Sequence, residues 1–395
     1  MSPVRVAVIG AGIAGPVAAM FLKQQGYDPV IFERNDGVTD AGLGIAIAGN
    51  GTRVLSQIPG LLEYIDGWEM EELHMYSVVP GDEGLLGTTD YFRRLRAKTG
   101  FGTFAVRRHD LHRRLVAFAQ RMGVEVRWSH HLAALEQGAD GVAMQFANGE
   151  VDSASFVVGC DGLHSNTRVC LFGDQPADYT GISQWGGIGL MPDAFRGKKA
   201  AVDFYGDGAA MVIVPVDETH GFWGLSVREP ESKETWRATD TLTMEDFKKS
   251  HFRQWGFGAG QAVQDCMKLT RYGLYDRPEL ATWHKGRVLV IGDAAHPSSP
   301  NHGQGANQAF EDIDLLISLL AAHNPTAVPP STAMLESVFR ELEAARIPRT
   351  AELARGARKQ GETRVAAGPE ACRARNAFYR EMCADEMKQK ARFGV

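Results

Sequence analysis

The chain has few cysteines, no long hydrophobic run and no strong excess of charge, and each of these absences excludes a class of protein. Its 395 residues include five cysteines with no CxxC spacing, which argues against a disulfide framework and against a structural zinc site. No apolar stretch reaches the roughly 18 residues that a membrane-spanning helix needs. The net charge of -6 offers no general attraction for nucleic acid or anionic lipid. We therefore expect a cytoplasmic globular protein with no membrane, nucleic-acid or metal partner.

The length and the pattern of apolar residues predict an α/β fold with two domains and a terminal appendage. A β-branched run at 4–9, an apolar helical pattern at 14–25 and a second run at 29–33 form a βαβ opening. The same texture returns after residue 287, where the letters VLVIGD precede a glycine-rich turn and a helix. This first, Rossmann-like domain is therefore predicted to be discontinuous in sequence.

A second domain is predicted from a change in texture. Glycine- and aromatic-rich runs between residues 181 and 227 indicate a mostly antiparallel sheet, whereas an Asn-Gly turn inside 141–159 predicts a hairpin belonging to the first domain. Three prolines near residue 330 mark a linker to amphipathic C-terminal helices. The predicted division assigns 1–72, 100–175 and 268–325 to the first domain, 73–99 and 176–267 to the second, and 326–395 to a C-terminal helical segment.

The letters GAGIAG after the first predicted strand match a dinucleotide-binding fingerprint. Gly10 allows a tight turn, Gly12 lets backbone N–H groups approach a pyrophosphate, and Gly15 lets the helix pack closely on the strand. The helix from Ala14 adds partial positive charge for the phosphate. Glu33 ends the second strand, where a carboxylate accepts ribose hydroxyls and repels a ribose phosphate. The pattern therefore predicts FAD or NAD in preference to NADP.

Two further segments make this prediction more specific. The letters VGCDGLHSNTR, at 158–168, place Asp161, Ser165 and Arg168 around a sharp turn, and IGDAAHPSSPNHGQGANQAFED follows at 291–312. With GAGIAG and Glu33, these segments resemble the FAD-dependent aromatic-ring monooxygenases, the group containing salicylate and hydroxybenzoate hydroxylases. The motifs follow the order and spacing of that family over roughly the first 320 residues. The resemblance makes the first domain FAD-binding and the second a substrate domain.

The resemblance implies a role for particular residues. Asp161 and Arg168 serve the FAD pyrophosphate and passing NAD(P)H, and Asp293 bonds a ribityl hydroxyl. Arg108, with Arg107 as the rival, lies beside FAD, and Arg34 either covers the adenine or is exposed. The flavin is approached by a loop, by backbone amides at a helix start and by a proline-containing wall: Gly44, Ile45 and Ala46; Gly303, Gly305, Ala306 and Asn307; Pro297 and Pro300. His296 is more simply a buried or capping histidine than a catalytic base.

The substrate site is the least specified part of the prediction. Large side chains of the second domain are candidates to line it, although each also suits an ordinary core: Trp185, Tyr205, Met211 and Trp223, with His302 from the flavin turn. Some family members carry an arginine for an anionic substrate where this chain reads Ala209-Ala210-Met211. An anionic group anchored at that point is therefore in doubt.

The reaction implied by the resemblance is hydroxylation of a phenolic or heteroaromatic ring. NADH or NADPH reduces FAD, dioxygen adds to form a flavin 4a-hydroperoxide, and one oxygen atom passes to the ring. The same fold also leaves open an epoxidase, an oxidase or a reductase. From another class, a non-catalytic chaperone for prenylated proteins would carry a degraded FAD fingerprint, whereas the motifs here are intact. The sequence does not choose between a monomer and a homodimer.

Overall fold

The computed structural model describes residues 3–40, 42–231 and 239–385, and within them it confirms the predicted α/β fold. The predictions that fall on residues 1–2, 41, 232–238 and 386–395 lie outside the described part. A six-stranded sheet, parallel except for its edge strand β18, forms the centre of the first domain. Its order is β18 (His284–Lys285), β19 (Val288–Val290), β12 (Phe156–Gly159), β1 (Arg5–Ile9), β2 (Asp28–Phe32) and β8 (Glu125–Arg127).

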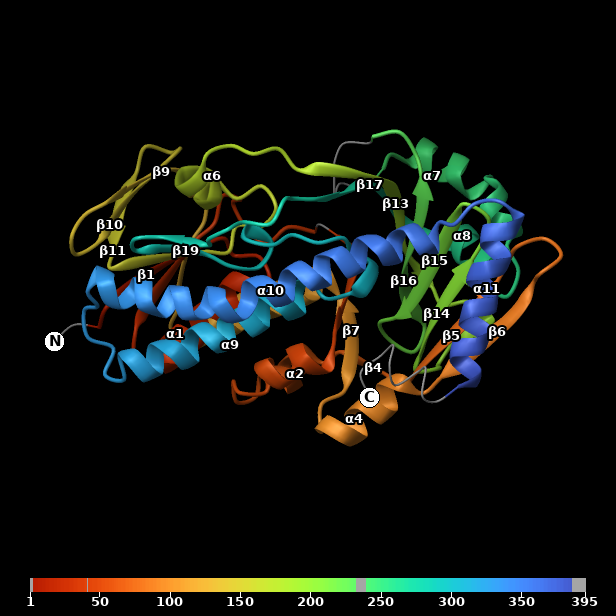
Figure 1. Cartoon of the computed structure of the whole chain (residues 1–395), viewed down its shortest axis with the longest axis horizontal. Helices are drawn as coiled ribbons and strands as arrows, with labels where there is room; N and C mark the ends of the chain where they lie inside the picture. Colours follow the sequence, from red (N-terminus) through yellow and green to blue (C-terminus); the bar gives the residue numbers. More distant parts are fainter. Residues whose placement is uncertain (1–2, 41, 232–238, 386–395) are drawn as a thin grey trace.

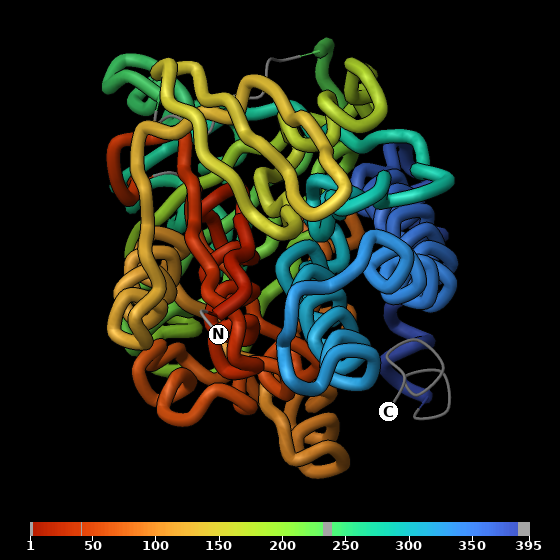
Figure 2. Tube along the Cα trace, turned by 90° about the vertical axis from the view of Figure 1, so that its left-hand side faces the viewer, coloured from red at the N-terminus to blue at the C-terminus, as the bar shows by residue number. Residues whose placement is uncertain are grey.

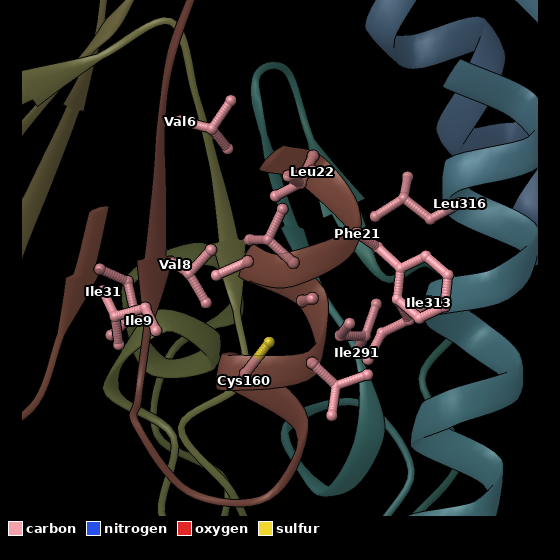
Figure 3. Packing of buried hydrophobic residues seen from close by; sticks show 14 of the residues in the cluster. Val6, Val8, Ile9, Phe21, Leu22, Ile31, Cys160, Ile291, Ile313 and Leu316 are labelled. Carbon is pink, nitrogen blue, oxygen red and sulfur yellow. The ribbon is translucent and has the colours of Figure 1, made fainter. Parts of the chain in front are cut away.

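Helix α1 (Ala14–Gln24) lies between this sheet and α9 (Gly305–His323), and its apolar face builds the core of the first domain. Figure 3 shows Phe21 of α1 directed toward Ile313 and Leu316 of α9, with Val8 on the neighbouring strand. All four side chains are buried. Because full burial of such a side chain stabilises the fold by about 1.5–3 kcal/mol, this packing holds the second half of α1 against α9.

The second domain is built on a seven-stranded, mostly antiparallel sheet. Residues from 268 onward were predicted to belong to the first domain. The strand Cys266–Asp276 nevertheless pairs with β13 (Asp178–Leu190) of this sheet, with two register shifts along its length. The order is β17 (Cys266–Asp276), β13 (Asp178–Leu190), β16 (His220–Arg228), β15 (Ala209–Pro215), β14 (Ala200–Tyr205), β5 (Glu72–Ser77) and β6 (Gly84–Thr89).

Two small sheets complete the described strands. β11 (Val151–Ala154), β10 (Val142–Phe146) and β9 (Leu132–Gln137) include the predicted hairpin, whose turn Gly149 closes with a bond from its N–H to the Phe146 carbonyl. β3 (Gly44–Ile47), β7 (Thr103–Arg107) and β4 (Trp68–Met70) form an antiparallel sheet. This second small sheet packs on the seven-stranded sheet, since Ala46, Val214 and Phe222 share one apolar cluster. It therefore connects the two domains.

The C-terminal helices join the domains along one side of the molecule. α10 (Thr332–Arg364) begins beside α9 and ends at β14, and α11 (Pro369–Ala384) then covers β6 (Figure 1). Figure 2 shows both helices, in blue, along one flank. No helix in the described part of the chain is both long and apolar enough to cross a membrane. The remaining helices are α2 (Gly49–Leu55), α3 (Leu61–Ile65), α4 (Tyr91–Thr99), α5 (Arg108–Arg121), α6 (Asn166–Phe172), α7 (Thr241–Lys248), α8 (Ala259–Gln264), η1 (Asp193–Phe195), η2 (His251–Gln254), η3 (Gly292–Ala294) and η4 (Pro300–His302).

Candidate active site

The glycine turn after β1 has the geometry of a phosphate cradle. Gly10 has a φ of 101°, and a Cβ on it would lie 2.8 Å from the Cys160 carbonyl oxygen. A Cβ on Gly15 would lie 1.8 Å from the Gly10 oxygen, so helix and strand approach closely only with glycine there. By contrast, a Cβ on Gly12 would meet no other described residue within 4 Å. Gly12 therefore borders open space, as a turn that receives a pyrophosphate requires.

Ala11, in the middle of this turn, is held from both sides. Its N–H donates to Glu33 Oε2 at 2.8 Å, and its carbonyl lies 2.7 Å from His112 Nε2. Burial lowers the pKa of His112, which favours the neutral imidazole with Nε2–H as the donor. His112 was not among the residues predicted from the sequence, although its i, i+4 spacing from Arg108 on α5 places both side chains on one helix face. The turn is thus preorganised by two buried side chains.

The segment after β12 changes the role expected for its charged residues. Asp161 accepts from Ser165 Oγ at 2.5 Å and from Thr167 N–H at 2.9 Å, so its carboxylate braces the start of α6. The Arg168 side chain takes other partners and does not pair with Asp161: its Nη1 donates to the Ala295 carbonyl at 3.2 Å. Arg168 is 2% exposed, and burial lowers its pKa. The segment therefore braces its own turn and the η3 region, and direct contact with FAD or NAD(P)H stays a prediction.

A buried charge network supports the turn that carries Asp293. The carboxylate of Asp312, which is fully buried, lies 2.6 Å from His296 Nε2 and accepts from Arg346 Nε at 2.7 Å. It also accepts the Gly292 N–H at 3.0 Å. Burial opposes ionisation, but His296 and Arg346 outweigh it and lower the pKa of Asp312. His296 is thereby engaged in holding the turn, in agreement with the simpler of the two roles predicted for it.

The start of α9 presents backbone amides next to β3. Gly303, with a φ of 61°, ends η4, and Gln304 at the N-cap makes no side-chain bond to the first helical N–H groups. Asn307 connects the two elements, because its Oδ1 accepts the Ala48 N–H at 3.0 Å and its Nδ2 donates to the Ala46 carbonyl at 3.2 Å. A helix start of this kind favours negative charge.

Arg108 lies between the glycine-containing loop and the second sheet. A Cβ on Gly42 would come within 2.6 Å of Arg108 Cδ. Burial lowers the pKa of Arg108, and the nearby acidic groups Asp293 and Tyr272 oppose that shift. The rival, Arg107, is 39% exposed and lies 3.7 Å from a surface carboxylate. The geometry therefore favours Arg108 as the arginine of the site.

The structure places Trp185, Met211 and Trp223, three of the predicted substrate-lining residues, on the face of the sheet opposite to Phe222. All three project from the face of the seven-stranded sheet that α7, η2 and α8 cover. Trp185 stacks on Phe247 of α7 with ring centroids 4.7 Å apart, and Trp223 is only 2% exposed. These residues therefore form the core between the sheet and the helices α7, η2 and α8. Their neighbours in sequence point to the opposite face, because successive residues of a strand alternate between faces.

The other two predicted substrate residues are Tyr205 and His302. They lie on the side of the seven-stranded sheet that faces β3 and α10, but their surroundings differ. The Tyr205 ring stacks on Tyr379 of α11 at 4.6 Å, and its hydroxyl donates to Asp203 Oδ2 at 3.1 Å. Tyr205 is therefore a buried contact with the C-terminal helices. His302 ends η4, and its ring lies against Gly356 of α10.

The face of the sheet that looks toward β3 carries residues that the sequence analysis missed. Phe222 lies directly against Gly44, because a Cβ there would fall 1.9 Å from the Phe222 ring. Tyr272 Oη donates to Gln184 Oε1 at 2.5 Å, and Gln184 Nε2 lies 3.4 Å from Ser226 Oγ. The polar groups of Gln184 and Tyr272, each within an otherwise apolar strand, were the signal in the sequence that could have identified them. Tyr272, Gln184 and Ser226 thus form a polar group on the sheet face that presents Phe222 to β3, and Tyr272 is close enough to Arg108 to influence its charge.

The other predicted residues lie around the same turns. Asp293 in η3 is exposed, and a Cβ on Gly305 at the start of α9 would lie 3.7 Å from its Oδ1. Pro300 begins η4, and Arg34 is exposed just after β2. The rest belong to these same elements: Ala14 to α1, Ile45 to β3, Pro297 to the segment between η3 and η4, and Ala306 to α9.

This arrangement fits FAD. The open space over Gly12 and the helix start after Ile13, whose side chain offers no acceptor, suit a pyrophosphate. The amides at the start of α9 face the loop containing β3, where a flavin ring would lie. No group of three or more His, Cys, Asp or Glu side chains suited to a metal ion occurs in the described ranges. Fold and site together define the class as a flavoprotein in which a parallel nucleotide-binding sheet is joined to a separate, mostly antiparallel sheet.

Comparison with known proteins agrees with the assignment of FAD to this site. Residues 3–331 match the family described as FAD binding domain, and the chain belongs to this family. The 3-amino-4-hydroxybenzoate 2-monooxygenase of Streptomyces cremeus is 32% identical over 364 residues, covering 91% of this chain and 87% of that protein. The 6-hydroxynicotinate 3-monooxygenase of Pseudomonas fluorescens is 26% identical over 330 residues, covering 81% and 84%.

A solved structure supports the fold over nearly the whole chain. Klebsiella pneumoniae HpxO, solved with FAD and uric acid, superposes with a TM-score of 0.84 at 24% identity, covering 98% of this chain and 95% of that one. The predicted family, the FAD cofactor with NAD(P)H as co-substrate, and the enzyme class are confirmed. The protein is an FAD-dependent monooxygenase that hydroxylates an aromatic ring, and the non-catalytic alternative is wrong.

Proposed function

We propose that this monooxygenase acts on a ring that carries a phenolic hydroxyl, or the equivalent hydroxyl of a heteroaromatic ring. The observation that carries the proposal is the buried bond from Tyr272 Oη to Gln184 Oε1, at 2.5 Å. Both residues project from the sheet face that presents Phe222 to Gly44. Apolar walls with a few fixed polar groups are typical of sites for flat organic molecules.

The residues then divide the work by their chemistry. FAD, when bound, takes electrons from NADH or NADPH and activates dioxygen for transfer to the ring. Tyr272 uses its proton on Gln184, and its oxygen lone pairs accept a hydrogen bond from a ring hydroxyl. The positive charge of Arg108 would favour the ionised form of the ring hydroxyl, whose proton passes to solvent, and the ionised ring is the better nucleophile. Phe222 packs on the ring plane and helps exclude water.

The relatives support a hydroxyl as the recognised group. One is named for 3-amino-4-hydroxybenzoate and another for 6-hydroxynicotinate, both rings with a hydroxyl substituent. In this chain Val212 and Val214 lie on the near face of β15, and Met211 points away. This strand therefore offers apolar contact, and recognition of the ring falls to Tyr272 and Gln184.

For the cofactor we propose that each predicted contact acts as its position suggests. The glycine turn holds the pyrophosphate, Glu33 the ribose and Asp293 the ribityl chain, while the amides at the start of α9 border the flavin. Support comes from the open space over Gly12 and the exposure of Asp293. The full set is Gly10, Gly12, Ala14, Gly15, Glu33, Arg34, Gly44, Ile45, Ala46, Arg108, Asp161, Arg168, Asp293, Pro297, Pro300, Gly303, Gly305, Ala306 and Asn307.

The test begins with the wild-type protein loaded with FAD. NADH and NADPH oxidation, oxygen uptake and hydroxylated product are measured with phenols, hydroxypyridines and amino-hydroxybenzoates, each paired with its deoxy analogue. We expect product from hydroxylated rings and a loss of kcat/KM of about 10- to 100-fold without the hydroxyl, because a buried polar group is then left unpaired. Equal kcat/KM for both members of every pair contradicts the proposal. Peroxide without product from every ring indicates the oxidase alternative.

Neighbouring residues on one strand provide a matched control. Gln184→Leu removes the partner of Tyr272, whereas Trp185→Phe alters the next residue on the opposite face of the sheet. Gln184→Leu should raise KM for the hydroxylated ring by about tenfold and leave the deoxy analogue unchanged. Trp185→Phe should leave both KM values at the wild-type level. The reverse order of effects would place the substrate on the other face.

We also propose that the enzyme works in the cytoplasm as a monomer or homodimer and has no nucleic-acid partner. The net charge of -6 and the wide spacing of the cysteines support this proposal. Light scattering of the FAD-loaded protein decides between monomer and dimer. A tightly associated nucleic acid after purification, seen as excess absorbance at short wavelength, would contradict the last point.

A further inference from the structure

We infer that Gly356 and Gly361 of α10 are positioning residues that seat the η4 turn and so set the place of the flavin-facing amides. A Cβ on Gly361 would lie 2.5 Å from Asn301 Nδ2, and one on Gly356 would lie 2.8 Å from His302 Cε1. Both distances are below 3.0 Å, so a side chain larger than that of glycine at either position requires the Asn301 or His302 side chain to move. Consecutive η4 residues are therefore received by two notches on one helix.

The notches oppose the preference of the helix itself. Glycine inside a helix costs about 1 kcal/mol relative to alanine. α10 runs for 33 residues and has these two glycines about 7.5 Å apart along its axis, both at the contact with η4. A local preference broken twice at one contact indicates a requirement from outside the helix.

The middle and the end of α10 are fixed to different domains. Near the middle of the helix, Arg346 donates to the buried Asp312 at 2.7 Å, and at its end Arg364 pairs with Asp203 of β14 at 2.7 Å. Both pairs are largely buried, so removing one partner is costly. Figure 1 shows α10 crossing from the six-stranded sheet to the seven-stranded sheet. A turn seated on this helix is therefore held at a set distance from both sheets.

From the notches the contact continues to the site. Asn301 and His302 are followed by Gly303 and by the amides at the start of α9, where Asn307 bonds to β3. Gly361 also approaches the second sheet, since a Cβ on it would lie 3.4 Å from Ile182 Cδ1. The notches thus position the flavin-facing turn relative to the sheet that holds the substrate. This inference rests on the proposed placement of flavin and substrate.

The test uses Gly361→Ala and Gly356→Ala in the FAD-loaded enzyme, with the exposed Lys359→Ala on the same helix as control. Misplacement of reacting groups by 1 Å costs about 100-fold, so a shift of a few tenths should lower product formed per NAD(P)H about tenfold. Thermal stability should stay equal or rise, because alanine favours the helix. The inference is overturned if both glycine variants form as much product per NAD(P)H as the wild type. It is also overturned if their loss of product per NAD(P)H equals that of Lys359→Ala.

Two further measurements separate this inference from the proposed function. The double variant Gly361→Ala/Asn301→Ala lacks the side chain that the new methyl group displaces. It should therefore form as much product per NAD(P)H as Asn301→Ala alone. Additive losses of product per NAD(P)H would contradict the proposed contact between Asn301 and Gly361. Hydrogen exchange of residues 299–307 in the apoprotein needs no turnover. Faster exchange there in the glycine variants, but not in Lys359→Ala, supports the notches even if the wild-type enzyme forms no product. Identical exchange in all variants refutes them.

Discussion

Alanine at Gly12 should abolish tight FAD binding without weakening the fold, whereas alanine at Gly15 should damage both. A methyl group at Gly12 meets no other described residue within 4 Å, and its backbone φ lies outside the left-handed region. The substitution should therefore keep or raise the free energy of unfolding of the apoprotein, by up to about 1 kcal/mol, because alanine restricts the unfolded chain.

The loss of affinity follows from the place of the methyl group. It would stand where the pyrophosphate approaches the backbone and would displace at least one N–H bond to a charged oxygen, worth about 1.5–3 kcal/mol. That energy corresponds to roughly a 10- to 100-fold rise in the Kd of FAD. At Gly15 the 1.8 Å distance to the Gly10 oxygen forces helix and strand apart by more than about 1 Å, and such overpacking costs about 1–3 kcal/mol.

The assay combines two measurements on each apoprotein: urea unfolding for stability, and titration with FAD followed by flavin fluorescence for affinity. Gly12→Ala that binds FAD like the wild type would show that the pyrophosphate does not pass over this turn. Gly12→Ala that loses more than about 1 kcal/mol of stability would show that the turn needs glycine for the fold alone. Either result would refute the reasoning.

Three other predictions test the packing around the site. Arg364→Leu leaves Asp203 buried without its cation, so urea unfolding should show a loss of about 3–5 kcal/mol, largely recovered when Asp203→Leu is added; a loss below 1 kcal/mol would contradict this. Burial lowers the pKa of His112 in the folded state, so its contribution to stability is complete above the unfolded pKa of about 6.5 and falls as the pH decreases below it. The stability difference between wild type and His112→Asn should therefore shrink from pH 7.5 to pH 5.5, and a constant difference refutes the neutral imidazole. Trp223→Phe should reduce the free energy of unfolding by about 1–3 kcal/mol and leave KM unchanged, whereas a raised KM at full stability would place Trp223 at the substrate.

The sequence was sufficient for the nucleotide domain because its requirements are local. Gly10, Gly12 and Gly15 act within one strand-turn-helix unit, and Glu33 follows on the next strand. Each requirement is set by neighbours in the chain, so spacing alone predicts it. His112 was missed because its acceptor, the Ala11 carbonyl, is 101 residues away.

The seven-stranded sheet was harder to predict, because a period of two shows that a strand has two faces but not which face packs on β3. Trp185 and Gln184 are adjacent in sequence, and aromatic size favoured Trp185, yet Gln184 is the residue on the near face. That choice is made by β3, which lies some 140 residues earlier and packs Gly44 on Phe222. Tyr205 likewise packs against Tyr379 of α11, a helix that comes much later in the chain.

Arg168 is a charged residue whose partners, being far away in the chain, could not be predicted from the sequence. In the sequence it is a guanidinium inside a nucleotide motif, and its charge suggests a phosphate. In the fold it is buried and donates to the Ala295 carbonyl, 127 residues further on. A buried arginine directed at backbone carbonyls contributes by fixing the turn that carries Asp293. Its substitution should therefore disturb FAD binding through this turn as well as through any direct contact with a phosphate.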